Sequence, residues 1–153
     1  MIVGIGVDIV DIPRFERTIE RTPQLLPRLF SEAEQQLKPH SQAARYAAKE
    51  ALIKALGGSD GVHWTEIEIA SEASGRPLFS LRGSTADVIA ERGITALHLS
   101  LSHDAGLATA FVILEAVPEA PTQGILRETE GDVPGLAANP LSRGSRGAEG
   151  AGA

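Results

Sequence analysis

Two acidic residues have the type and the setting needed to hold a metal ion. Asp8 interrupts the apolar segment GIGVDIV, and Glu50 lies in the most strongly predicted helix of the chain. A carboxylate buried without a partner is costly, so Asp8 must lie at a strand end, pair with a cation or bind a metal. One carboxylate from a strand and one from a helix, together with water and phosphate oxygens, can hold Mg²⁺. Asp8 and Glu50 are therefore candidate metal ligands.

Basic residues flank Glu50 on the same predicted helix. The chain has only three lysines, and Lys49 and Lys54 lie on either side of Glu50. With about 100° of rotation per residue, Glu50 and Lys54 share one side of the helix, and Arg45 and Lys49 share another edge. Together they form one charged strip, in which Lys54 and Arg45 could meet phosphate groups and Lys49 has only a supporting role. The alternative is a solvated face with weak ion pairs.

Another predicted helix carries a basic stripe. Arg14, Arg17 and Arg21 are spaced i, i+3, i+7, which places them on one face. On an acidic protein such a stripe suits an acidic partner surface. The alternative is a surface helix in which Glu20 pairs with Arg17. His103 ends a predicted strand, where a structural role is the alternative to a functional one.

The helices and strands that must position these residues can be predicted from hydrophobic periodicity and from the residues that begin or end such elements. Alternation and β-branching predict strands, and capping residues with Gly and Pro mark the helix ends. Ser31 and Glu34 form a predicted capping box, Pro39 is read as ending that helix, Gly57 as ending the long helix, and Ser84 as an N-cap. In chain order we predict a strand over 1–10, helices over 13–21, 28–37 and 42–57, strands over 65–71 and 78–82, a helix over 85–92, and strands over 97–102 and 107–115 joined by a loop at 104–106.

These elements indicate an α+β domain, a mostly antiparallel sheet packed against the long helix. The small side chains of that helix, such as Ala47, Ala51 and Ala55, predict the face that packs on the sheet. The domain is expected to span residues 1–118. Residues 119–153 contain 7 Gly and 3 Pro among 35 residues, which predicts a disordered tail. The alternative is a tail docked through Ile125, Leu126 and Leu136.

Composition narrows the function classes. The chain has no cysteine, so disulfides, cysteine-based zinc sites and thiol nucleophiles are excluded. A net charge of −6 argues against general nucleic-acid binding. No apolar run reaches the length of a membrane span, and the start MIVGIGVDIVD lacks the pattern of a signal peptide. We expect a cytoplasmic protein without nucleic-acid or membrane partners.

Five motifs occur in a characteristic order along the chain. They are GIGVDIVDIPRF at 4–15, LFSEAE at 29–34, RYAAKEALIKALG at 45–57, GRP at 75–77 and LSLSHD at 99–104. Together they resemble bacterial holo-acyl-carrier-protein synthases, the short, single-domain type of the 4′-phosphopantetheinyl transferase superfamily. The resemblance covers about residues 1–117, and its most specific feature is the pairing of a GxD strand with a KEA-containing helix.

The resemblance implies a reaction and a partner. Members transfer 4′-phosphopantetheine from coenzyme A to a serine of apo-acyl carrier protein and release adenosine 3′,5′-bisphosphate. They are homotrimers with active sites between subunits. Acyl carrier proteins are small acidic helical bundles, which gives the stripe of Arg14, Arg17 and Arg21 a partner, with Arg14 and Arg21 better supported than Arg17.

The resemblance also implies roles within the site. Mg²⁺ would bind to Asp8 and Glu50, Lys54 would reach the phosphate, and Arg45 and His103 would contact the 3′-phosphate end of coenzyme A. Glu50 is the candidate base, and Asp8 acting through water is equally open. Two other functions remain as alternatives: a hydrolase of the coenzyme A pyrophosphate, and a non-catalytic module that binds coenzyme A or a carrier domain.

Overall fold

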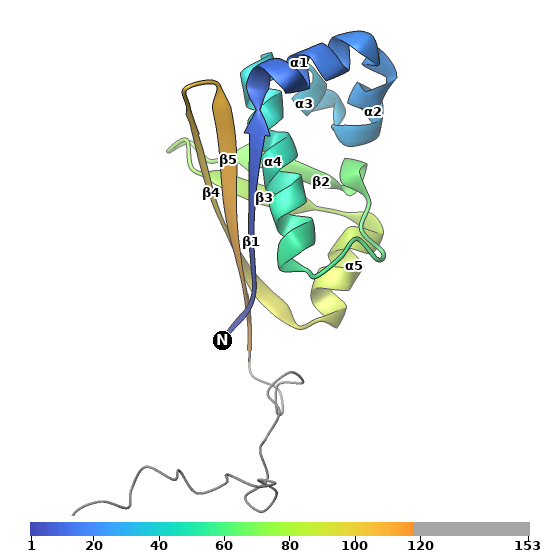
Figure 1. The fold of residues 1–153 in the computed structure, drawn as a ribbon. Helices are drawn as coiled ribbons and strands as arrows, with labels where there is room; N and C mark the ends of the chain where they lie inside the picture. Colours follow the sequence, from blue (N-terminus) through green and yellow to red (C-terminus); the bar gives the residue numbers. More distant parts are fainter. Residues whose placement is uncertain (118–153) are drawn as a thin grey trace, which may run out of the picture. The chain divides into compact units, whose positions relative to one another are not determined.

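The computed structural model describes residues 1–117, and the predicted tail at 119–153 lies outside the described residues. The main sheet has three antiparallel strands in the order β1 (Ile2–Asp11), β5 (Leu107–Ala116) and β4 (Ile94–Asp104). A separate two-stranded sheet pairs β2 (Ile67–Ser71) with β3 (Pro77–Leu81). The predicted antiparallel α+β architecture is confirmed (Figure 1).

The helices follow the expected order, with differences at their ends. They are α1 (Ile12–Arg21), α2 (Leu26–Leu29), α3 (Glu32–Gln35), α4 (Pro39–Ala55) and α5 (Gly83–Glu91), with 3₁₀ turns η1 (Pro23–Leu25) and η2 (Trp64–Glu66). The single helix predicted over 28–37 is wrong: two short helices flank Phe30 and Ser31, although the predicted capping box between Ser31 and Glu34 is present. Pro39 begins α4 instead of ending the preceding helix, because proline suits the first helical turn.

Helix α5 shows a further difference. The Ser84 hydroxyl donates to Gly61 O at 2.9 Å, and Ser84 lies inside the helix rather than at its N-cap. The first turn is held by Glu66, whose Oε2 accepts from Thr85 N at 2.8 Å. The N-cap prediction for Ser84 is therefore wrong, because a carboxylate from another segment takes that role.

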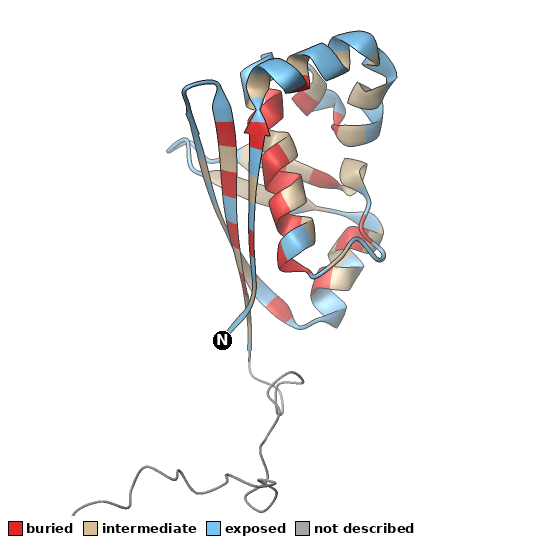
Figure 2. Ribbon diagram, viewed as in Figure 1, coloured by how far each residue is buried: buried red, intermediate tan, exposed pale blue. Residues whose placement is uncertain are grey.

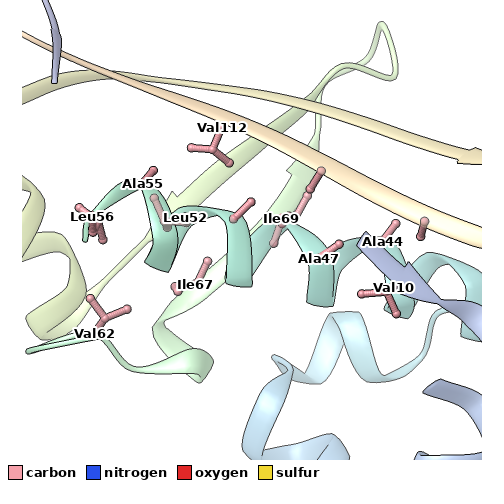
Figure 3. Packing of buried hydrophobic residues seen from close by; sticks show 14 of the residues in the cluster. Val10, Ala44, Ala47, Leu52, Ala55, Leu56, Val62, Ile67, Ile69 and Val112 are labelled. Carbon is pink, nitrogen blue, oxygen red and sulfur yellow. The ribbon is translucent and has the colours of Figure 1, made fainter. Parts of the chain in front are cut away.

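The core lies around α4. Leu52 and four alanines of this helix, at positions 43, 47, 48 and 51, are fully buried. Figure 3 shows Val112 of β5 and Ile67 of β2 on opposite sides of the helix, so α4 is covered by both sheets. Within the described residues, no helix has the length and apolar character needed to span a membrane.

Strand β1 approaches α4 more closely than side chains would allow. A Cβ on Gly4 would collide with the carbonyl oxygen of Ala55, and a Cβ on Gly6 with that of Ala51. Glycine is needed here because the two backbones nearly touch. This contact fixes the strand that carries Asp8 against the helix that carries Glu50.

The outward face of β1 and the adjoining part of β5 are apolar and exposed. Buried and exposed residues alternate along β5, as expected for a sheet packed on one side (Figure 2). On β1 the outward side chains of Ile5, Val7 and Ile9 are all more than half exposed. Phe111 of β5 continues this surface. Adjacent exposed apolar side chains such as these indicate an interaction site.

Candidate active site

Asp8 lies on the helix-facing side of β1, where it is paired with a lysine. Lys54 Nζ donates to Asp8 Oδ1 at 2.6 Å and to Val7 O at 3.3 Å. The Asp8 side chain is 15% exposed and that of Lys54 is 51% exposed. The hydrogen bond to Asp8 is the main reason that the pKa of Lys54 is raised. The structure therefore shows Asp8 paired with a cationic side chain, which is one of the three settings expected for it.

Glu50 lies one helical turn before Lys54 and close to Asp8. Its pKa is raised, first by burial and second by the negative charge of Asp8, and is lowered to a lesser extent by Lys54. Two carboxylates that repel each other in this way favour a cation between them. No cluster of three or more metal-ligating side chains occurs within residues 1–117. A divalent ion bound by Asp8 and Glu50 would therefore need water or substrate oxygens as further ligands, which suits Mg²⁺.

A pocket of about 290 Å³ opens beside the two carboxylates. It lies between α1, β1 and α4, so it joins the carboxylates to the helix with the basic stripe. Its lining residues are Asp8, Ile9, Val10, Asp11, Arg14, Phe15, Thr18, Tyr46 and Glu50. The structure thus brings three predicted site residues, Asp8, Glu50 and Arg14, to one pocket.

The three stripe arginines are exposed on α1. None of them forms an ion pair with a described residue, so the alternative pairing of Arg17 with Glu20 is not present. Asp11 caps the helix by accepting from Arg14 N at 2.7 Å, with Pro13 in its first turn. The basic surface of α1 is therefore free for a partner.

Arg45 and His103 do not line this pocket. Arg45 Nη1 donates to Ser41 O at 3.2 Å, while its buried Nε has no hydrogen-bond partner among the described residues. Burial is the main cause of its lowered pKa. His103 is exposed at the end of β4, and its ring lies 5.8 Å from that of His40, a residue that sequence reasoning left without a role. These two predicted residues therefore lie outside the pocket that holds the carboxylates.

Lys49 corrects the predicted charged strip. Its side chain is fully buried, and its Nζ donates to Glu34 Oε2 at 2.7 Å, Leu29 O at 2.6 Å and Trp64 O at 3.1 Å. Burial lowers the pKa of Lys49, and the hydrogen bond to Glu34 opposes that shift. Lys49 therefore belongs to the core and not to the face that carries Glu50.

Glu34, which sequence analysis used only as a cap, is the centre of this network. Its Oε2 also accepts from Ser31 N at 3.0 Å, and its Oε1 accepts from Ile69 N at 3.0 Å. The pair of Glu34 and Lys49 thereby connects α2, α3, α4, η2 and β2. Because Lys49 directly precedes Glu50 in α4, anchoring Lys49 in the core also fixes the rotation of α4 that places Glu50 in the pocket.

Comparison with known proteins identifies relatives of this arrangement. A family model described as the 4′-phosphopantetheinyl transferase superfamily matches residues 4–112. The holo-[acyl-carrier-protein] synthase of Clavibacter sepedonicus is 60% identical over 115 residues, which cover 75% of this chain and 97% of that protein. The crystal structure of the synthase from Neisseria meningitidis is similar with a TM-score of 0.70 at 35% identity, covering 75% of this chain and 99% of that one. The synthase of Helicobacter pylori in complex with coenzyme A has a TM-score of 0.65 at 34% identity, covering 72% and 99%.

Proposed function

The chain belongs to the 4′-phosphopantetheinyl transferase superfamily, and from that membership we propose how its own residues carry out the reaction. The activity is that of a holo-[acyl-carrier-protein] synthase. It transfers 4′-phosphopantetheine from coenzyme A to a serine of apo-acyl carrier protein and releases adenosine 3′,5′-bisphosphate. We assign the catalytic domain to residues 1–118, because 115 residues of this chain cover 97% of a relative's length.

We propose that Asp8 and Glu50 hold Mg²⁺. Their common pocket, their mutual repulsion and the lack of a third described ligand all suit an ion that keeps water and substrate oxygens. When bound, this ion would neutralise charge on the pyrophosphate of coenzyme A. Lys54, already held near Asp8, would contact the phosphate from the same side of α4. The residues supply position and charge, which is what phosphoryl transfer needs.

The proton of the carrier serine needs an acceptor, and we propose Glu50. Glu50 lines the same pocket as Asp8, so it could accept this proton directly or through a water bound to the metal. Asp8 is instead engaged by the Lys54 ammonium. Asp8 acting through water remains the other assignment for this step.

Arg45 and His103, together with Lys54, are our candidates for the coenzyme A side of the site. The buried Nε of Arg45 is a donor without a partner in residues 1–117, so a phosphate oxygen could satisfy it. The relative from Helicobacter pylori is a complex with coenzyme A. We propose that the reaction takes place in the cytoplasm.

We further propose that the chain acts as a homotrimer. The outward face of β1 and β5 exposes Ile5, Ile9 and Phe111 by 56%, 61% and 43%. Association of identical chains would bury this face. Light scattering is expected to give the mass of three chains, and a monomer at micromolar concentration would contradict the assembly.

The observation that carries the assignment is the pocket in which Asp8, Glu50 and Arg14 meet. Incubated with Mg²⁺, coenzyme A and an apo-acyl carrier protein, the protein is expected to add one phosphopantetheine to one serine, read by intact mass. A carrier that gains no mass while coenzyme A is cleaved would identify a hydrolase. Binding of both substrates with no turnover would identify a binding module.

The basic surface of α1 predicts how the carrier is recognised. Arg14→Glu reverses a charge at the edge of the pocket, so the KM for the acidic carrier is expected to rise about tenfold or more, while the KM for coenzyme A stays unchanged. The effect should shrink as salt is added, because the interaction is between exposed charges. Arg17→Glu is the matched control, with a smaller effect because Arg17 does not line the pocket. Equal losses for both substrates would argue against docking at α1.

A further inference from the structure

Tyr46 forms a rigid wall of the pocket. It is the only tyrosine of the chain and lies on α4, facing α1 and β1 across the pocket. Its ring stacks on Trp64 with centroids 5.1 Å apart and an interplanar angle of 26°. On another side its ring lies 5.7 Å from that of Phe15 of α1. The phenol therefore cannot turn away from the pocket without losing both aromatic contacts.

The hydroxyl of Tyr46 is a polar group that the fold does not use. It makes no hydrogen bond to any residue in the described part of the chain. A buried hydroxyl without a partner would count as an unsatisfied buried atom, and within residues 1–117 the only such side-chain atom is Nε of Arg45. The Tyr46 hydroxyl is therefore accessible to solvent, and Tyr46 lines the pocket. A fixed, unpaired and accessible donor beside two carboxylates is suited to binding a ligand oxygen.

The charges around this hydroxyl define its chemical state. The negative charges of Asp8 and Glu50 favour the protonated phenol, and the positive charges of Arg14 and Lys54 oppose this effect. Burial first, and then Glu50 and Asp8, raise the pKa of Tyr46. The phenol remains protonated at neutral pH and can donate a hydrogen bond.

We propose that the Tyr46 hydroxyl donates a hydrogen bond to an oxygen at or beside the acceptor serine of the carrier protein. The pocket supports the carrier rather than coenzyme A as the source of that oxygen. One wall belongs to α1, including Arg14, whereas Arg45 and His103 do not line it. Tyr46 is thus a substrate-contacting residue between the docking helix and the carboxylates. This inference rests on the proposed carrier surface of α1.

The test is Tyr46→Phe, which removes only the hydroxyl and keeps the ring between Trp64 and Phe15. The KM for apo-carrier is expected to rise about 3- to 10-fold, the effect of one lost hydrogen bond. The Kd for apo-carrier, measured by calorimetry without coenzyme A or Mg²⁺, should rise by the same factor. The KM for coenzyme A and the melting temperature should not change. A merely structural tyrosine would leave the carrier KM and Kd at their wild-type values.

Thr18→Val is the matched control, since Thr18 also presents a hydroxyl near this pocket. That hydroxyl already donates to Arg14 O at 2.9 Å, so its loss should raise the carrier KM several-fold less than Tyr46→Phe does. Equal effects of the two variants, or a Tyr46→Phe effect on the KM for coenzyme A alone, would overturn the inference. If Tyr46→Phe has the wild-type KM for the carrier while Arg14→Glu has a raised one, the inference about Tyr46 is overturned but the proposed carrier surface of α1 is supported. If Arg14→Glu is also normal, the carrier surface itself is wrong.

Discussion

Replacing Glu50 with glutamine is expected to reduce kcat by about a hundredfold or more, the scale seen when one preorganised electrostatic group is removed. The amide keeps the length and shape of the side chain but loses the charge that complements Asp8 around a cation. Half-saturation by Mg²⁺ should move to higher concentration, and calorimetric titration with Mg²⁺ should show weaker binding. An unchanged Mg²⁺ dependence would remove Glu50 from the metal site.

Stability provides the control for that variant. The folded protein raises the pKa of Glu50, so the ionised side chain is less favourable in the folded state than in the unfolded chain. The stabilising contribution of such a group is present below the unfolded pKa and is lost as the pH rises through the folded pKa. At neutral pH and in the absence of Mg²⁺, Glu50→Gln should therefore melt at the wild-type temperature or above it. A large drop in melting temperature would attribute the lost turnover to unfolding.

The largest expected loss of stability comes from Lys49→Met. Removing one member of a buried ion pair typically costs about 3–5 kcal/mol of unfolding free energy. Here the methionine fills similar space, but Glu34 keeps a buried charge, and the carbonyls of Leu29 and Trp64 lose their donor. Urea unfolding followed by the fluorescence of Trp64, the single tryptophan, measures this cost.

The double variant Lys49→Met with Glu34→Gln separates charge from packing. Removing the second charge should recover part of the stability, so the double variant should unfold less readily than the sum of the two single changes predicts. Losses that simply add, or a Lys49→Met cost below about 1 kcal/mol, would show that the two side chains do not act as a buried pair.

The parts of the site that could be predicted depend on local pattern. The apolar run around Asp8 predicted a strand, and the alanines around Glu50 predicted a helix that packs on it, so their convergence follows once the strand and the helix touch. The two patterns together indicated a shared metal site, whereas the transfer reaction and its substrates came from the resemblance to a family. His103 could be placed on its strand but not relative to the carboxylates, because the end of β4 is positioned by its hairpin with β5.

The helical wheel predicted an exposed charged strip that includes Lys49, and this prediction is wrong because Lys49 is buried. The wheel assumed one covered side for the long helix, whereas the main sheet, β2 and the segment around Phe30 cover it from several directions. Charged side chains are almost never fully buried unless they are paired, so an exposed Lys49 was the ordinary expectation. The available signal was Glu34 in the LFSEAE motif, a carboxylate with more lone pairs than a capping box uses.

The contact of Gly4 and Gly6 with α4 gives β1 two kinds of position, which differ in the side chains that they tolerate. At Gly4 and Gly6 no added atom is tolerated, since even a methyl group would meet the carbonyl oxygens of Ala55 and Ala51. On the outer side, at Ile5 and Ile9, bulk and apolar character matter more than any single atom. An alanine at either glycine would therefore separate the two segments that carry the carboxylates.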